Sequence, residues 1–112
     1  MKIDVQLHGQ VAVVTPRGAL TRDCADPFIQ GMKAPLEQRR GEVVVDCRDI
    51  PYLDSVGIET LLTVCGDRRS PTPRPRLAGL TDTCREALDL TNTLSRFEIF
   101  DSVESALRSY KR

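Results

Sequence analysis

Apolar and polar residues alternate at the start of the chain. Ile3, Val5 and Leu7 are each followed by a polar residue, which is the period-two pattern of a strand with one buried face. A β-branched run follows at 11–15, and the Gly-Gln pair at 9–10 between the two segments suits a tight turn. The opening segment therefore predicts a β-hairpin.

Helical and strand patterns alternate through the rest of the chain. The strand expected at 43–47 is apolar on both faces, which is typical of a central parallel strand covered by helices on both sides. Strands that alternate with helices imply right-handed crossovers and a mostly parallel sheet. The apolar spacing places the later elements at about 28–36 (helix), 43–47 (strand), 56–67 (helix), 77–80 (strand), 82–90 (helix), 97–100 (strand) and 103–110 (helix).

The predicted fold is therefore a single α/β domain over residues 1–112. Its element order is β-β-α-β-α-β-α-β-α, which gives a mixed, mostly parallel sheet of about five strands with about four helices. Thr21 or Asp23 is expected to cap the first helix, and Pro35 is expected to kink that helix or end it early. Caps of the last two helices are expected at Thr81 or Asp82 and at Asp101 or Ser102.

Composition narrows the functional classes. The 112 residues contain 40% hydrophobic residues, enough for one core, and the charges balance at 16 basic and 16 acidic side chains. A nucleic-acid binder needs a basic excess and aromatic platforms, whereas this chain has 4% aromatic residues and no Trp. Nucleic acid is therefore not expected as a partner.

The chain also offers little for metal or covalent chemistry. His8 is the one histidine. The four cysteines stand too far apart for a CxxC motif and fall in apolar or helical patterns, so we expect reduced thiols in packed positions: Cys24, Cys47, Cys65 and Cys84. The first residues do not form a secretory signal, and no apolar run is long enough to span a membrane. We expect a cytoplasmic protein with no cofactor and no membrane insertion.

Ser55 is the residue with the clearest functional potential. It lies where the loop after the central strand leads into a helix, and ligand sites of such sheets gather at the carboxyl ends of strands. A serine there can act as an N-cap, or it can accept a phosphate that the helix N-terminus tolerates. Asp54 and Glu59 are expected in the first turn of this helix, where the helix dipole favours acids. Catalysis is not expected, because the segment lacks GxSxG and a base other than His8.

The segment 66–76 is rich in Pro and Arg and has no periodicity. It can be a solvated surface loop, or its arginines can face an acidic partner. The arginines concerned are Arg68, Arg69, Arg74 and Arg76.

The run VVVDCRDIPYLDSVGIETLL at 43–62 resembles the core of STAS domains, and in particular the bacterial anti-sigma factor antagonists. Those proteins carry an apolar strand, a short loop and then D-S-x-G-[L/I] at the start of a helix. Gly18-Ala19-Leu20 is similar to the family's G-x-L after the second strand, and residues 80–107 are similar to its closing helix, strand and helix.

The resemblance implies a partner-switching regulator that is not an enzyme. In the family, a serine kinase of the histidine-kinase-like ATPase fold doubles as the anti-sigma factor and phosphorylates the serine, and a metal-dependent serine phosphatase reverses this. The unphosphorylated antagonist binds the anti-sigma factor. Carried over by position, Ser55 is the phosphoacceptor, Gly57 gives a partner access to it, and Ile58 and Leu61 anchor the helix. The partner-binding residues so implied are Asp54, Ser55, Val56, Gly57, Ile58, Glu59, Thr21 and Asp23.

Three features differ from the family pattern. Thr21 stands where an acid usually follows G-x-L, Glu59 replaces a small residue after the motif, and the segment 66–76 replaces a Gly-containing turn. A carboxylate at position 59 would repel a phosphate on Ser55 and retune phosphorylation. The alternative function is a non-switching STAS subunit of a stress-sensing scaffold or of a membrane transport complex.

Overall fold

The computed structural model describes residues 1–66 and 74–110. Its sheet has five strands in the spatial order β1-β2-β3-β4-β5. The strands are β1 (Lys2–His8), β2 (Val11–Arg17), β3 (Val43–Asp46), β4 (Arg76–Ala78) and β5 (Ile99–Phe100). The helices are η1 (Arg22–Cys24), α1 (Ala25–Gln38), α2 (Ser55–Cys65), α3 (Asp82–Leu90), η2 (Leu94–Arg96) and α4 (Val103–Arg108), where η denotes a 3₁₀ helix.

The predicted hairpin is confirmed. β1 and β2 pair antiparallel in a register that brings His8 opposite Val11, and Gly9 adopts the positive φ (63°) that this tight turn requires. β2, β3, β4 and β5 pair parallel in chain order, so the sheet is mixed and mostly parallel, as expected.

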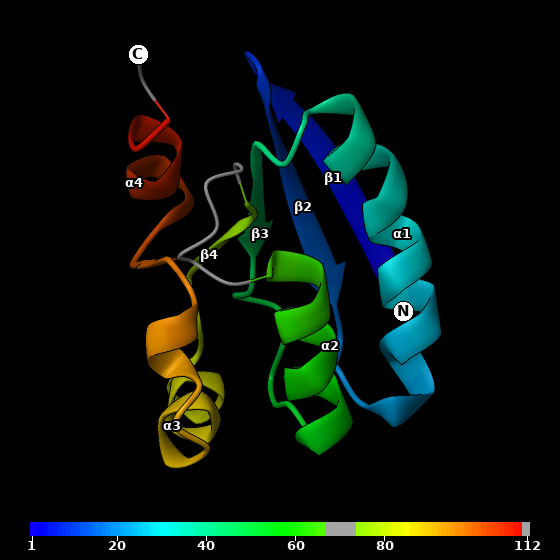
Figure 1. Cartoon of the computed structure of the whole chain (residues 1–112), viewed down its shortest axis with the longest axis vertical. Coiled ribbons are helices and arrows are strands. Elements are labelled where there is room, and N and C mark those ends of the chain that lie inside the picture. The colour runs from blue at the N-terminus through cyan, green and yellow to red at the C-terminus, as the bar shows by residue number, and fades with distance from the viewer. Residues whose placement is uncertain (67–73, 111–112) are drawn as a thin grey trace.

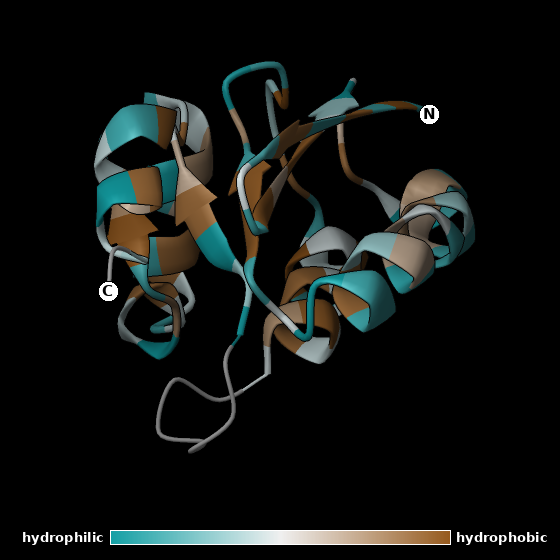
Figure 2. Ribbon diagram, turned by 90° about the horizontal axis from the view of Figure 1, so that it is seen from above, coloured by the Kyte–Doolittle hydropathy of each residue, from teal (hydrophilic) through white to brown (hydrophobic). Residues whose placement is uncertain are grey.

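The helices form two unequal layers. Because each crossover moves the chain one strand further in the same direction, right-handedness puts α1, α2 and α3 on one face of the sheet. Only α4 covers the other face, and Figure 2 shows the strands between α1 and α2 on one side and the C-terminal helix on the other. The expectation that helices cover both faces is thus confirmed with three helices on one face and one on the other.

The alternation of side chains along β2 and β3 separates the two cores. Val45 faces the larger core, which contains Phe28 and Met32 of α1 and Leu61 of α2. Val44 faces the smaller core under α4. All four residues of β3 are buried, as predicted for a central strand.

The end of the first helix differs from the prediction. Pro35 does not end α1, which continues to Gln38, and the Arg39 N–H donates to the Pro35 carbonyl at 3.0 Å. A proline inside a helix removes one backbone hydrogen bond. Here its ring is buried, so the apolar packing offsets that loss.

Some expected caps are present and others are not. Neither Thr21 nor Asp23 caps the first helix through its side chain, because a short 3₁₀ turn, η1, precedes α1. Thr81 caps α3, since its side chain accepts from the Cys84 N–H, and Ser102 caps α4, since its side chain accepts from the Ser105 N–H. In each case one of the two predicted residues is the cap. Smaller differences are that α2 ends at Cys65 and that Phe97 lies before β5.

Candidate functional site

The candidate site lies where α2 begins, at the lower end of the sheet in Figure 1. Asp54 is the N-cap of α2: its Oδ1 accepts from the Gly57 N–H at 2.7 Å. Its Oδ2 accepts from the Arg22 N–H at 3.0 Å. One carboxylate thus fixes the start of α2 and joins it to η1, which follows β2 in the chain.

Ser55 is the first residue of α2, and it is exposed. Because Asp54 satisfies the capping requirement, the cap role that the sequence left open for Ser55 belongs to its neighbour. Within the described part of the chain, the Ser55 hydroxyl has no hydrogen-bond partner. The hydroxyl is therefore free to react or to contact another molecule.

The ionisation of Asp54 follows from this geometry. The hydrogen bond from the Gly57 N–H, and next the one from the Arg22 N–H, lower the pKa of the Asp54 carboxyl below its usual 3.8. The charged form is the one that accepts both bonds. At neutral pH a negative charge therefore sits beside Ser55.

The G-x-L segment is packed directly against this corner. Leu20 is fully buried, its N–H donates to the Tyr52 carbonyl at 3.2 Å, and its carbonyl accepts from the Asp54 N–H at 3.3 Å. A parallel bridge joins Leu20 to Leu53. The two loops at this end of the sheet are thereby connected through backbone hydrogen bonds.

Gly57 has a structural task at this contact. A Cβ atom on Gly57 would lie 2.0 Å from the Leu20 carbonyl oxygen, so only glycine allows α2 to approach the G-x-L backbone. Gly57 and Ile58 are both buried. Gly57 therefore packs closely inside the domain and Ile58 anchors the helix, as expected for Ile58, while access for a partner at Gly57 stays a prediction.

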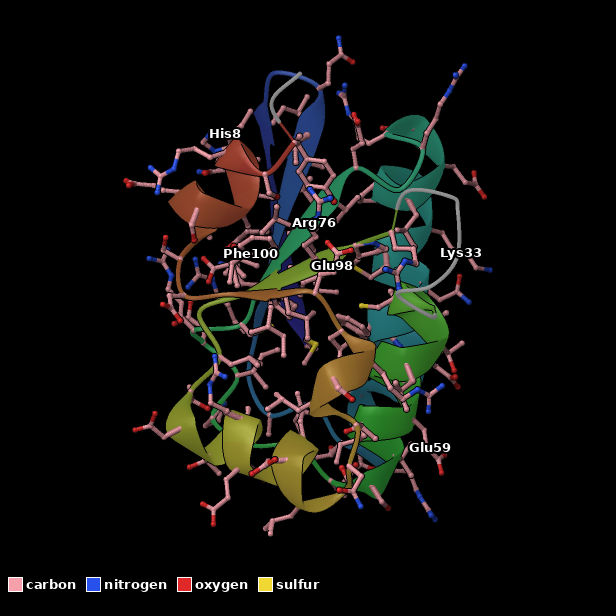
Figure 3. All side chains as sticks on the ribbon, turned by 60° about the vertical axis from the view of Figure 1, so that its left-hand side comes forward. His8, Lys33, Glu59, Arg76, Glu98 and Phe100 are labelled. Atoms are coloured by element: carbon pink, nitrogen blue, oxygen red, sulfur yellow. The ribbon has the colours of Figure 1, made fainter. Side chains whose placement is uncertain are left out.

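The remaining predicted partner-binding residues lie on α2 and at η1, which contacts α2. Asp23 and Glu59 are exposed, and Thr21 and Val56 are partly exposed. Glu59 lies beyond the first turn of α2, which contains no acid, so the prediction that placed it in that turn is wrong. Figure 3 shows its side chain projecting outward from α2.

The structure adds two residues to this surface that the sequence did not single out. Tyr52 is 51% exposed, although a large aromatic side chain normally favours burial. Arg22 is exposed beside the Asp54 carboxylate to which its own N–H is bonded. Two sequence features could have pointed to them: Tyr52 is an aromatic residue just before the D-S-x-G motif, and Arg22 is a cation two residues after G-x-L.

The arginines of the 66–76 segment that the structure describes do not face outward. Arg74 and Arg76 both pair with Glu98, at 3.3 and 2.8 Å, and the Arg76 guanidinium lies 3.8 Å from the centre of the Tyr110 ring. Figure 3 shows Arg76 and Glu98 side by side on the sheet. Both expectations for Arg74 and Arg76, a solvated loop or a surface for an acidic partner, give way to an internal ion pair. Arg68 and Arg69 lie outside the described residues.

The cysteines belong to the core and form no disulfide. Cys47, Cys65 and Cys84 are buried, and Cys24 is partly buried. Burial raises the pKa of the Cys65 thiol to about 12, and it also raises that of Cys47 and Cys84.

Over residues 1–66 and 74–110, no group of three His, Cys, Asp or Glu side chains is arranged to hold a metal ion. Nor does any helix in those ranges have the length and apolarity to cross a membrane.

A mixed sheet with three helices on one face, and an exposed serine at the start of the helix after the central strand, define an α/β domain with a candidate site on its surface. The model of the STAS domain family matches residues 2–106, so the chain belongs to that family. No curated protein matches the sequence significantly.

Solved structures share the whole fold at low sequence identity. A protein described as a putative anti-sigma factor antagonist from Thermotoga maritima is 16% identical, with a TM-score of 0.83 over 98% of this chain and 95% of that chain. Unphosphorylated SpoIIAA, a Bacillus anti-sigma factor antagonist also solved in a phosphorylated form, is 13% identical, with a TM-score of 0.72 over 99% and 100%. The murine anion transporter Slc26a9 is 16% identical, with a TM-score of 0.76 over 93% of this chain and 18% of the transporter.

Proposed function

We propose that the protein is an anti-sigma factor antagonist whose partner binding is switched by phosphorylation of Ser55. The observation that carries this proposal is the division of tasks at the start of α2. Asp54 caps the helix and leaves the Ser55 hydroxyl exposed and unbonded among the described residues. A serine needed for the fold would be bonded, whereas a phosphoacceptor has to be accessible.

The proposed switch is electrostatic. A phosphate adds close to two negative charges and stands at the N-terminal end of α2, where the helix dipole is favourable. The fold would therefore persist, while the surface around Ser55 would become more negatively charged. SpoIIAA, which shares this fold, has been solved with and without phosphate, and this supports the proposal by analogy.

The proposed contact surface consists of exposed groups around the serine. Tyr52 would provide an aromatic contact, because tyrosines are enriched among residues that dominate binding energy and this one is exposed. Partly exposed and charged residues would form the rim: Thr21, Asp23, Asp54, Val56 and Glu59. The partners in this proposal are an anti-sigma factor that is also a serine kinase of the histidine-kinase-like ATPase fold, and a metal-dependent serine phosphatase.

The proposal includes neither catalysis nor a cofactor, and it places the protein in the cytoplasm. The four free thiols support a reducing compartment, since secreted domains of this size commonly use disulfides. The packing of Arg74 and Arg76 against Glu98 removes two candidate cations from any contact with nucleic acid.

The first test is the intact mass of the protein isolated from its own cells, with mapping of any phosphate. We expect a substoichiometric phosphate on Ser55. In parallel, Ser55→Ala and Ser55→Asp proteins serve as matched baits, and the kinase should be retained by the alanine variant and lost by the aspartate variant. Equal capture by both baits and no phosphate under growth, stress or phosphatase inhibition would contradict the proposal.

The second candidate is a non-switching STAS subunit of a larger assembly. Structural similarity to part of Slc26a9 is the observation that favours it, since that STAS fold is one part of a transporter chain. This function predicts that the protein elutes from native lysate in a large complex, before and after phosphatase treatment alike. The switching antagonist instead predicts an elution that depends on phosphatase.

A further inference from the structure

The backbone of Arg22 is held against the start of α2. The Arg22 N–H is bonded to Asp54 Oδ2 at 3.0 Å, and Asp54 is joined to Ser55 by a peptide bond. The two backbones are thus held on either side of one carboxylate. The Arg22 charge also acts on the Asp54 carboxyl, so the guanidinium lies near the residue that precedes Ser55.

The Arg22 guanidinium also makes no salt bridge within residues 1–66 and 74–110, although its charge helps to lower the pKa of Asp54. Two other arginines near this edge are already paired. Arg17 pairs with Asp4 at 2.6 Å and Asp49 at 2.8 Å, and Arg48 pairs with Asp46 at 3.1 Å.

The other charged side chains of η1, of the first turn of α1 and of the start of α2 are acids. They come from the elements packed against this corner, since η1 and α1 both contact α2. They are Asp23 of η1, Asp26 of α1, Asp54 at the cap and Glu59 one turn into α2. Within η1, α2 and the first turn of α1, as far as these are described, Arg22 is the one cation among these four carboxylates.

We infer that phosphorylation of Ser55 captures Arg22 in an internal ion pair and thereby removes this cation from the partner-binding surface. In the unphosphorylated protein the guanidinium is exposed and can contact an acidic group on the partner. A phosphate is a stronger ligand for arginine than a single carboxylate, because it offers three charged oxygens to the planar guanidinium. Phosphorylation would then change the surface twice, by adding an anion and by withdrawing a cation.

Glu59 would oppose this capture. Ser55 and Glu59 are four residues apart on α2, so they lie on the same face of the helix. A phosphate on Ser55 would be repelled by Glu59 and attracted by Arg22. The two side chains therefore have opposite predicted effects on one measurable property, the affinity of the phosphate for its second proton.

The inference rests on Ser55 as the phosphate site, but its test does not need the kinase. Phosphoserine can be placed at position 55 during expression by an expanded genetic code, and the second pKa of its phosphate can be followed by ³¹P NMR. Arg22→Gln should raise that pKa by about 0.8 pH unit, the effect of one charge at an ion-pair distance of about 4 Å in water. Glu59→Gln should lower it by about 0.4 pH unit, because a like charge one helical turn away stays at about twice that distance.

The matched control is Arg108→Gln, which removes the same charge from an exposed residue of α4 on the other face of the sheet. It should leave the phosphate pKa unchanged, and 1 M NaCl should reduce the effects of Arg22→Gln and Glu59→Gln. If Arg22→Gln shifts the pKa no more than Arg108→Gln does, the inference is wrong. Absence of phosphate in cells would instead overturn the proposed function while leaving this measurement intact.

Discussion

Asp54 accepts hydrogen bonds from two segments that are far apart in the chain, and both bonds are stronger to its charged form. The Gly57 N–H lies within α2, whereas the Arg22 N–H belongs to η1. The folded state therefore holds the pKa of this carboxyl below 3.8. Stability and pH are linked through this one residue.

The sign of that linkage gives a prediction. Because the pKa of Asp54 is lower in the folded state, its contribution to stability is complete above the unfolded pKa, at about pH 5 and higher. It is lost as the pH falls through the folded pKa. Urea unfolding between pH 7 and pH 3 should show a smaller loss of stability for Asp54→Asn, which keeps a capping oxygen but does not titrate.

Comparing the wild type with Asp54→Asn isolates the contribution of Asp54 to the pH dependence of stability. The pKa of Asp4 is also lowered, by its hydrogen bond with Arg17, and that carboxyl titrates in the same pH range in both proteins. The difference between the two curves removes this shared contribution. Parallel curves for wild type and Asp54→Asn would contradict the assignment.

Gly57 allows a second prediction at the residue scale. Gly57→Ala places a methyl group 2.0 Å from a backbone oxygen that cannot move freely, so we expect a loss of about 1–3 kcal/mol in the free energy of unfolding. Gly31→Ala is the matched control, because its Cβ would meet only the tip of the flexible Ile3 side chain at 2.5 Å. Its gain in helix propensity of about 1 kcal/mol offsets that contact. Equal losses in the two variants would refute the close-packing role of Gly57.

At the scale of elements, α4 is held on the sheet by polar contacts as well as by its small core. The Tyr110 hydroxyl lies within hydrogen-bond distance of the carbonyls of Val43 and Arg74, at 3.3 and 3.0 Å, and shares its one hydrogen between them. The Tyr110 ring lies under Arg76, which in turn pairs with Glu98. Residues just after α4 are thereby joined to β3, β4 and the segment before β5.

This arrangement predicts that Arg76 cannot be replaced by another cation. Arg76→Lys keeps the charge but loses the planar stacking on Tyr110 and the fixed geometry toward Glu98. We expect it to lower the free energy of unfolding by about 1 kcal/mol, measured by chemical denaturation. Arg108→Lys, at an exposed site of α4, should leave stability within about 0.5 kcal/mol, and a similar small effect of Arg76→Lys would argue against the stacking.

At the scale of the whole molecule, the candidate switch lies on a surface that the two cores do not use. Ser55 is exposed, while the side chains that fill the larger core point away from it into the space between sheet and helices. A negative charge on Ser55 also stands at the favourable end of the α2 dipole. Phosphorylation is thus expected to change binding and to leave folding intact.

The corresponding prediction compares two properties of Ser55→Asp. Its thermal unfolding midpoint and far-UV circular dichroism should match those of the wild type, with a stability change within about 1 kcal/mol. Its capture of the partner should be lost. A variant that fails to bind because it is unfolded would contradict a switch that acts on the surface alone.

Much of the fold follows from local patterns in the sequence. Alternation predicted the β1–β2 hairpin, and a run apolar on both faces predicted β3 as a central strand, because burial on one or both faces leaves a period that can be read along the chain. The D-S-x-G segment indicated the candidate site because it, too, is a local feature of the sequence. Its capping acid, its serine and its glycine are neighbours in sequence.

The tertiary structure decided which of these residues does what. Whether Asp54 or Ser55 caps α2, and whether Gly57 faces a partner or Leu20, depends on a contact between α2 and a loop more than thirty residues earlier. The same holds for Arg76, which reads as part of a solvated segment but pairs with Glu98 and Tyr110. Local sequence determines which elements form, since periodicity and capping act over a few residues. Roles that depend on long-range contacts are fixed only when the sheet brings distant loops together.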